Sequence, residues 1–386
     1  MAIILKPYEL SSYNANTWVL ETPEGHFNIN QQSKQLIDLL SRSQSFEDAH
    51  NQFKSEFEIE LTKENFDAFI NSQLASTGLL GDVEQVENKK EKSFIKLEFT
   101  ILKKETAKKL ATPLKPLFQP VFFWIAFTAL FLLALYTVFF RSFEETEVSA
   151  LAVAALYFVT ILFHELGHIA ACSRFTGRNG EIGGGFYVIF PVLYSSISSM
   201  WHATKRERVI GNLAGVYMQL WCLLVSLLLF SLFPDLGIFA EIAFMVSIYS
   251  LIQLVPFIRS DGYWLLSDLT DTPNLLSKSS QAIKDLFTKP QTLFIKQERI
   301  KNTGLILYGS FNTLIVIYFV GYQLFYNWEE IIHFPLHLWD MLKQILQLQI
   351  PDFEAEFIIV ILFYVILFNY LRRAYTAIFK PKEELI

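Results

Sequence analysis

The sequence predicts an α-helical, polytopic membrane protein of about six transmembrane helices, with a re-entrant segment and a small N-terminal α+β domain. Three observations predict this class. Hydrophobic residues make up 52% of the 386-residue chain, and aromatic residues 16%. Charged residues make up 18%, below the roughly 25% that is typical of soluble domains. After residue 118, apolar runs of about 20 residues recur, which is long enough to cross a bilayer.

Residues 1–85 have the composition of a soluble domain. The stretch NTWVLETPEGHFNI predicts two short strands around a Pro-Glu-Gly turn. Three helical patterns follow, with apolar residues at three- and four-residue spacing: SKQLIDLLS, SFEDAHNQFKSEF and LTKENFDAFINSQLASTGLL. Ser45 and Thr62 stand where helix N-caps are expected. A strand pair with three helices is the outline of a small winged-helix-like domain.

The rest of the chain is predicted to form a basic connector (86–118), a membrane domain (119–378) and a short cytoplasmic tail (379–386). The predicted spans lie at about 120–140, 148–172, 209–232, 236–258, 303–325 and 355–377. The apolar stretch 182–198 is shorter and is interrupted by Gly and Pro. This pattern predicts a re-entrant segment, whose backbone must be satisfied by protein or by a water-filled cavity.

Charge predicts the orientation and excludes one class of partner. The loops that follow the second and fourth spans are rich in Arg and Lys, whereas the opposite loops contain FEETE and PDFEAE. By the positive-inside rule, we expect both termini to be cytoplasmic. The net charge of −6 argues against a nucleic-acid partner. His202, beside Trp201, is expected at the membrane interface. The two cysteines, Cys172 and Cys222, offer no disulfide framework.

The segment YFVTILFHELGHIAACSRF places His164, Glu165 and His168 inside a predicted span. Ionisable groups at that depth are costly and are functional candidates by default. Histidines four positions apart project from one face of a helix, so both imidazoles can reach one zinc ion. Glu165 beside them can act as base on the bound water. The alternative is that the three groups only form hydrogen bonds between helices.

A catalytic zinc ion has three protein ligands and an open position for water. Asp261, in LVPFIRSDGYWLLSDL, follows the fourth span on the cytoplasmic side. Pro256 and Gly262 break the helix around it, which lets the carboxylate turn inward. A helix-ending Asp-Gly turn is the alternative, and Asp268 and Asp271 are competing candidates farther from the membrane. The residues thus predict one zinc ion per chain.

Four features occur in one order: HELGH in a span, a Gly-rich re-entrant segment, NLAGVYMQ and a late SDGYW. Together they resemble the site-2-type intramembrane zinc metalloproteases. Within that group the chain is most similar to the bacterial peptide zinc metalloproteases that are encoded beside biosynthesis genes for ribosomal peptides. The resemblance covers about residues 115–275. It implies zinc held by His164, His168 and Asp261, with Glu165 as general base and acid, in an endopeptidase that matures a ribosomally synthesised peptide or removes its leader.

The chain departs from the family pattern at two places. The family's Ala-Gly-Pro…Asn motif occurs here as Ala-Gly-Val with Gln219 in the Asn position, and SSISSMW stands where acidic residues are expected. Gln219 and Asn212 are the candidates for holding an oxyanion or positioning the substrate. A substrate must be extended to be cut, and an edge strand could hold it in that form. The residues expected to supply that edge are Gly183, Gly184, Gly185 and Phe186.

The N-terminal helices, from QQSKQLIDLL to the final GLL, resemble the winged-helix domains of the pyrroloquinoline-quinone chaperone type, which hold the leader of a ribosomal precursor peptide. The resemblance implies that a leader adds as a strand to the small sheet. The expected partners are the lipid bilayer, a peptide or membrane-protein substrate, a leader peptide and subunits of a peptide exporter. Two alternatives are a signalling protease that cuts a membrane-tethered regulator and a non-enzymatic zinc-binding exporter component. A generic domain that serves stability is the alternative for residues 1–85.

Overall fold

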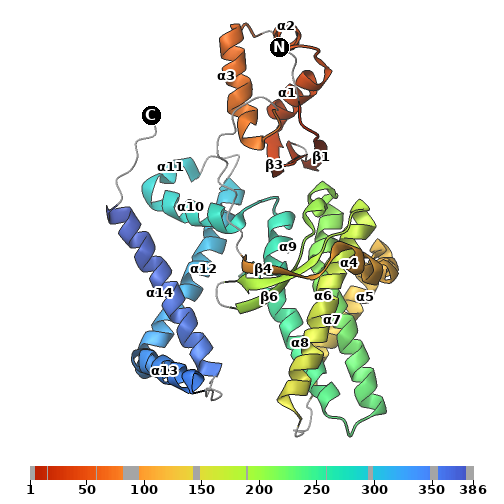
Figure 1. The fold of residues 1–386 in the computed structure, drawn as a ribbon, viewed down its shortest axis with the longest axis vertical. Helices are drawn as coiled ribbons and strands as arrows, with labels where there is room; N and C mark the ends of the chain where they lie inside the picture. Colours follow the sequence, from red (N-terminus) through yellow and green to blue (C-terminus); the bar gives the residue numbers. More distant parts are fainter. Residues whose placement is uncertain are drawn as a thin grey trace. The chain divides into compact units, whose positions relative to one another are not determined.

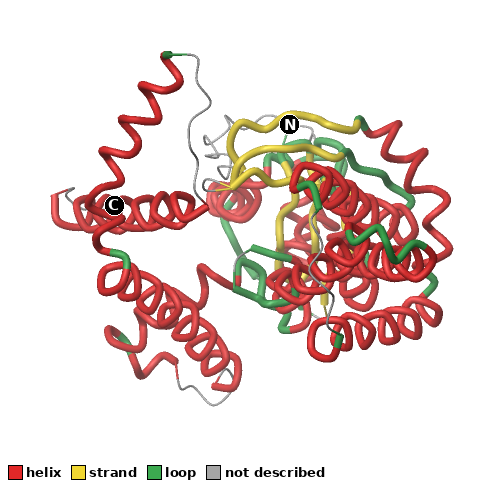
Figure 2. Tube along the Cα trace, turned by 90° about the horizontal axis from the view of Figure 1, so that it is seen from below, coloured by secondary structure: helices red, strands yellow, loops and turns green. Residues whose placement is uncertain are grey.

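The computed structural model describes residues 5–14, 16–57, 59–80, 95–141, 148–187, 190–257, 259–293, 299–347 and 355–379. The described chain is mostly helical and contains two small sheets (Figure 1, Figure 2). It divides into two compact units. The first unit comprises residues 1–93, 97–185 and 192–273, and the second comprises residues 94–96, 186–191 and 274–386.

An antiparallel meander begins the first unit. Its strands are β1 (Glu9–Asn14), β2 (Thr17–Thr22) and β3 (Gly25–Asn30), in the order β1-β2-β3. Thr22 pairs with Gly25 across the predicted turn, so the hairpin prediction is confirmed. Gly25 has a φ of 142°, which glycine adopts without steric cost. The sequence did not predict β1.

Three helices follow the meander, as the apolar spacing predicted. They are α1 (Gln31–Arg42), α2 (Phe46–Phe57) and α3 (Lys63–Leu74), followed by the 3-10 turn η1 (Ala75–Thr77). Both predicted N-caps are confirmed: Ser45 Oγ accepts from the Asp48 amide at 3.1 Å, and Thr62 Oγ1 accepts from the Asn65 amide at 3.3 Å. The buried core of this domain includes Leu20, Leu36, Ile37, Phe53, Phe66 and Leu79.

Apolar helices form the body of the first unit. They are α5 (Pro120–Phe140), α6 (Ala150–Thr176), α7 (Lys205–Leu232) and α8 (Ile238–Gln253). Helix α7 packs against the other three, and Figure 1 shows these helices side by side. Gly167 permits the close approach of α6 and α7, because a Cβ at this position would lie 2.4 Å from the Ala214 carbonyl oxygen. The shared core includes Leu166, Ile169, Leu213, Val216, Tyr217, Leu220, Ala243 and Val246.

A second sheet forms where the sequence predicted a connector and a re-entrant segment. Its strands are β4 (Ile95–Leu102), β5 (Ile182–Tyr187) and β6 (Phe190–Ser195), in the order β4-β5-β6. The sequence IKLEFTIL of β4 alternates apolar and polar residues, which is a strand signal inside the lysine-rich connector. The shorter helical elements of the first unit are α4 (Lys104–Ala111), η2 (Thr112–Phe118), η3 (Ser198–His202) and α9 (Asp261–Leu269). Connector residues 86–94 lie outside the described residues.

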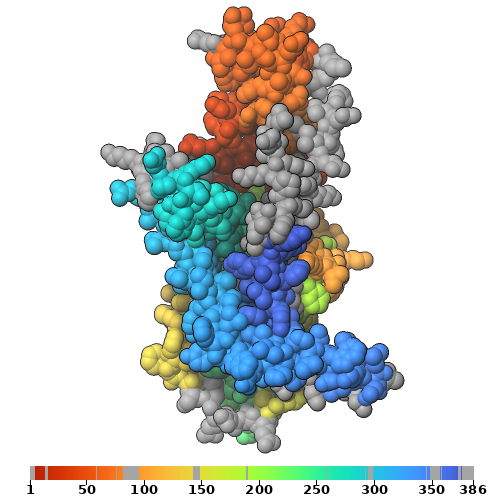
Figure 3. Space-filling view, turned by 90° about the vertical axis from the view of Figure 1, so that its left-hand side faces the viewer, coloured from red at the N-terminus to blue at the C-terminus, as the bar shows by residue number. Residues whose placement is uncertain are grey.

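The second unit is helical through most of its described residues. Its helices are α10 (Leu275–Thr288), α11 (Pro290–Leu293), α12 (Arg299–Tyr326), α13 (Trp328–Leu346) and α14 (Ala355–Phe379). In the space-filling view, α12 to α14 form a continuous blue surface (Figure 3). Apart from Phe379, the predicted tail lies outside the described residues.

Among the described residues, four helices are long and apolar enough to cross a membrane: α5, α6, α7 and α12. Each coincides with a predicted span. The remaining two predicted spans fall on α8 and α14, where the apolar stretches Ile238–Gln253 and Ile359–Arg372 are shorter. A count of six spans, and the orientation of the chain, therefore stay predictions.

Candidate metal centre

Helix α6 carries two buried histidines on one face. His164 and His168 are 6% and 8% exposed, and they stand one helical turn apart. Their Nε2 atoms lie 3.2 Å from each other. Glu165, which is 6% exposed, follows His164 directly. The helix therefore holds three ionisable side chains away from solvent at one place.

Asp261 reaches the two histidines from the first position of α9. Its Oδ2 lies 3.4 Å from His164 Nε2, and its Oδ1 lies 3.4 Å from His168 Nε2. Gly262 permits this placement, because a Cβ there would lie 2.2 Å from the Leu254 carbonyl oxygen. The three residues predicted as ligands thus lie together, with one ligand atom from each within 4.8 Å of the others.

Hydrogen bonds on the far side of each imidazole fix its orientation. His164 Nδ1 lies 3.3 Å from Gln219 Oε1, and His168 Nδ1 lies 2.9 Å from the Gly211 carbonyl oxygen. Both partners are acceptors, so each Nδ1 carries the proton and donates it. Each Nε2 then presents a lone pair toward Asp261. Metal-binding histidines are held in this way.

The separations of these atoms fit one tetrahedral cation. Zinc–nitrogen bonds of about 2.0–2.1 Å place tetrahedral ligand atoms about 3.3–3.4 Å apart. The two imidazole Nε2 atoms lie 3.2 Å apart, and each lies 3.4 Å from a different oxygen of Asp261, so the contacts are close to this spacing. Asp261 Oδ2 is buried and has no hydrogen-bond partner among the described residues. Without a cation, the lone pairs of the two imidazole Nε2 atoms would face the Asp261 carboxylate. Imidazole and carboxylate together are a ligand set for zinc and similar metals.

Gly215 on α7 keeps the centre of this group open. A Cβ at this position would lie 2.4 Å from His164 Nε2 and 2.5 Å from His168 Nε2. Real Cβ atoms do not approach other heavy atoms this closely, so a side chain at this position would displace the imidazoles. The glycine of the NLAGVYMQ motif is therefore required sterically, because only a residue without a side chain leaves room for the two imidazoles.

Ser195 at the end of β6 contacts Glu165, although the sequence did not predict a role for it. Its hydroxyl donates to Glu165 Oε2 at 2.6 Å and also lies 2.9 Å from the Glu165 carbonyl oxygen. Ser195 begins SSISSMW, the stretch where acidic residues were expected. No local pattern marks one serine of this stretch, because its partner is reached only through the fold.

Gln219 combines a contact with His164 and an unused donor. It is fully buried on α7, and its Nε2 has no hydrogen-bond partner among the residues the structure describes. A buried amide donor without a partner costs free energy, so it has a reason to bind a ligand. This position is compatible with the predicted role of Gln219 as a donor to an oxyanion.

Three other candidate residues lie away from the histidines. Asn212 Nδ2 donates to Asp268 Oδ2 at 2.7 Å, so the structure does not bring this amide to the predicted site. Asp271 pairs with Lys205 Nζ at 2.8 Å. Both competing aspartates thus have other partners, and Asp261 is the one that meets the histidines.

The predicted substrate edge needs a correction. Residues Gly183, Gly184, Gly185 and Phe186 lie in β5, which is the middle strand of its sheet. The prediction of an edge strand here is wrong, because β5 pairs with β4 on one side and with β6 on the other. The sequence analysis had not predicted β4. A Cβ at 183 would lie 2.4 Å from the Tyr194 ring, and one at 184 would lie 2.7 Å from the Phe99 ring. These glycines therefore permit close packing, and the edges of the sheet are β4 and β6.

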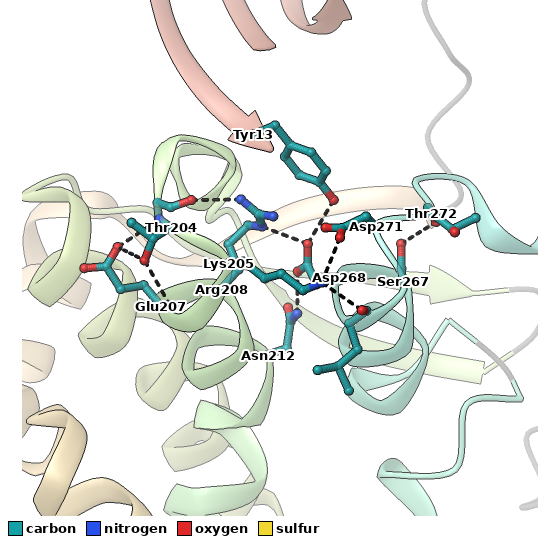
Figure 4. Close-up of polar contacts among 12 residues, drawn as sticks. Tyr13, Thr204, Lys205, Glu207, Arg208, Asn212, Ser267, Asp268, Asp271 and Thr272 are labelled. Carbon is teal, nitrogen blue, oxygen red and sulfur yellow. Dashed lines mark hydrogen bonds and ion pairs between the residues drawn. The ribbon is translucent and has the colours of Figure 1, made fainter. Parts of the chain in front are cut away.

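The N-terminal domain contacts the helix that begins with Asp261. Tyr13 on β1 donates to Asp268 Oδ1 at 3.1 Å, and its ring lies 3.9 Å from the Arg208 guanidinium carbon (Figure 4). Arg208 Nε also donates to Asp268 Oδ1, at 2.8 Å. Burial and the Asp268 carboxylate raise the pKa of Tyr13, so its phenol remains a donor at neutral pH. Helix α9 therefore carries both this contact and Asp261.

Comparisons with known proteins found no match for this chain. No family model matches it, and neither a curated protein nor a solved structure matches it. Any function must therefore be argued from the histidine–aspartate group and the residues around it.

Proposed function

We propose that this chain is a membrane-embedded zinc endopeptidase. The observation that supports this proposal is the convergence of His164, His168 and Asp261 beside Glu165. Three protein ligands leave a position for water, as catalytic zinc sites do. Structural zinc sites usually have four protein ligands, and the described residues add no fourth His, Cys, Asp or Glu to this group. This difference favours an enzyme over a non-enzymatic exporter component.

The proposed reaction is hydrolysis of a peptide bond. Zinc in such a site lowers the pKa of water to about 7 and polarises a carbonyl. Glu165 takes a proton from the attacking water and delivers it to the leaving amine. Ser195 holds the Glu165 carboxylate through its 2.6 Å hydrogen bond, and the free amide of Gln219 donates to the developing oxyanion.

We propose that the substrate lies extended along β6. A peptide bond inside a helix is shielded by its own hydrogen bonds, so the substrate must be unwound before it is cut. An edge strand holds an extended peptide through main-chain hydrogen bonds, and β6 is an edge of its sheet. Its last residue, Ser195, contacts Glu165, so a peptide paired with β6 would reach the proposed base.

The N-terminal domain is proposed to recognise the leader of a ribosomally made precursor. In its sheet, β1 and β3 are the edge strands, and a leader can add to such an edge. A membrane-tethered regulator is the alternative substrate, in a signalling protease with the same centre. In either case the apolar helices would hold the chain in a bacterial inner membrane, with both termini in the cytoplasm.

The test combines zinc content with cleavage of a quenched fluorescent peptide library by the detergent-purified full chain. Glu165→Gln should retain zinc at this site and lose about 10²–10⁴-fold in cleavage rate, which is the usual contribution of a general base. His164→Ala should lose the zinc of this site and also lose cleavage. Equal rates in the parent and Glu165→Gln would reject Glu165 as the base. Cleavage by a His164→Ala protein that holds no zinc at this site would reject the zinc mechanism.

A further inference from the structure

A second group of metal-ligand side chains lies between the N-terminal sheet and η3. It consists of Glu21 on β2, His26 on β3 and His202 at the end of η3, all within the first unit. Glu21 Oε2 lies 2.9 Å from His202 Nε2 and 3.8 Å from His26 Nε2. The two imidazole centroids are 5.5 Å apart. One ligand atom from each residue lies within 4.8 Å of the others.

The surrounding contacts leave the ligand atoms directed at one another. Ser11 Oγ lies 2.7 Å from His202 Nδ1 and can accept its proton, which leaves the lone pair of Nε2 toward Glu21. His26 Nε2 is buried and has no hydrogen-bond partner among the residues that the structure describes. Such a nitrogen is costly to bury, and a cation between it and the carboxylate would remove that cost.

Arg178 is the competing positive charge at this group. Its guanidinium donates to Glu21 Oε2 at 2.6 Å and also forms an ion pair with Glu9. One arginine is thus shared by two carboxylates, and Glu9, Glu21 and Arg178 together carry a net charge of −1 when the histidines are neutral. Carboxylates that bind metals are commonly oriented by hydrogen bonds from outside the metal site, and Arg178 is placed for that role.

We propose that Glu21, His26 and His202 bind a second divalent transition-metal ion such as zinc. Two imidazoles and a carboxylate are a zinc ligand set, and water would complete the tetrahedron. Because Glu21 and His26 belong to the N-terminal hairpin and His202 to η3, this ion joins the N-terminal domain to the helical body. It shares no ligand with the His164 group, so it does not depend on the proposed peptidase.

The experiment counts metal ions in the detergent-purified full chain after dialysis against zinc. We expect two ions per chain in the parent, one in H26A/H202A and one in H164A/H168A. His333, exposed on α13 and outside both groups, supplies the control: His333→Ala should keep two ions. In the H164A/H168A protein, cobalt should still give the visible absorption of a protein-bound ion, and adding the H26A/H202A changes should remove it.

The second site would be overturned if the parent binds a single ion that is kept in H26A/H202A and lost in H164A/H168A. This result is distinct from failure of the His164 site. The opposite pattern would support the second site and reject the first. A further measurement does not depend on the folding of H26A/H202A, because it uses H164A/H168A alone: zinc should slow amide exchange in residues 17–30 by about tenfold or more. Unchanged exchange would also overturn the site.

Discussion

The Ser195 hydroxyl donates a 2.6 Å hydrogen bond to Oε2 of Glu165 and so joins strand β6 to helix α6. The last residue of β6, the strand that we propose as the substrate edge, therefore contacts Glu165, the residue that we propose as general base. Pairing of a peptide with β6 would shift or hold Ser195, and through it the Glu165 carboxylate. In the proposed reaction, this one hydrogen bond would link substrate alignment to proton transfer.

Replacing Ser195 by Ala should lower kcat about tenfold and leave zinc content unchanged. The reason is loss of one hydrogen bond to a charged group, worth about 1.5 kcal/mol. Peptide cleavage and zinc per chain are measured on the same preparation. Ser196→Ala, at the exposed neighbouring serine, should keep the parent kcat. If Ser195→Ala also keeps it, the hydroxyl has no part in the reaction.

Replacing Gly215 by Ala should abolish zinc binding at the His164 group. The added Cβ would stand 2.4 Å from His164 Nε2, so the imidazoles must move apart. Gly321→Ala is the matched control, because a Cβ there meets no atom within 4 Å among the described residues. The control should retain zinc and gain slightly in thermal stability, since Ala favours a helix by about 1 kcal/mol over Gly. Full zinc occupancy in Gly215→Ala would mean that the ligands lie elsewhere.

The parts of the site that follow local rules were predictable from the sequence. His164 and His168 belong together because helical geometry alone places positions four apart on one face. Asp261 was predictable for a related reason: Pro256 and Gly262 interrupt the helix beside it. The helices of the N-terminal domain and their caps likewise follow from local spacing.

The parts that depend on distant pairing were not predictable. The alternation in β4 lies inside a lysine-rich connector, and only pairing with β5 distinguishes a strand from an amphipathic connector. Without β4, the glycines of β5 looked like an edge. His202 was expected at the membrane interface, yet its partner Glu21 lies 181 positions earlier in the chain. No sequence spacing encodes such a contact.

Asp261→Asn and Asp268→Asn should have different effects, because we propose Asp261 as a metal ligand, whereas Asp268 pairs with Arg208. Asp261→Asn should weaken zinc binding by more than the roughly 10–100-fold that changes outside the ligand set cause. Asp268→Asn should retain zinc but lower the free energy of unfolding by about 3 kcal/mol, because Arg208, which is 3% exposed, loses its counter-charge. Zinc titration and thermal unfolding distinguish the two. Zinc loss in Asp268→Asn alone would transfer the ligand role to that residue.

Tyr13→Phe should reveal how strongly the N-terminal domain is held against α7 and α9. The phenol contributes one hydrogen bond to Asp268, so its loss should cost about 1 kcal/mol of unfolding free energy at pH 7, while the ring keeps its contact with Arg208. Because folding raises the pKa of Tyr13, its contribution is fully present below the unfolded pKa of about 10 and is lost as pH rises beyond it. Thermal unfolding at pH 7 and at pH 11 should therefore show a smaller difference between parent and Tyr13→Phe at the higher pH. Equal differences at both pH values would show that ionisation of Tyr13 is not coupled to this contact.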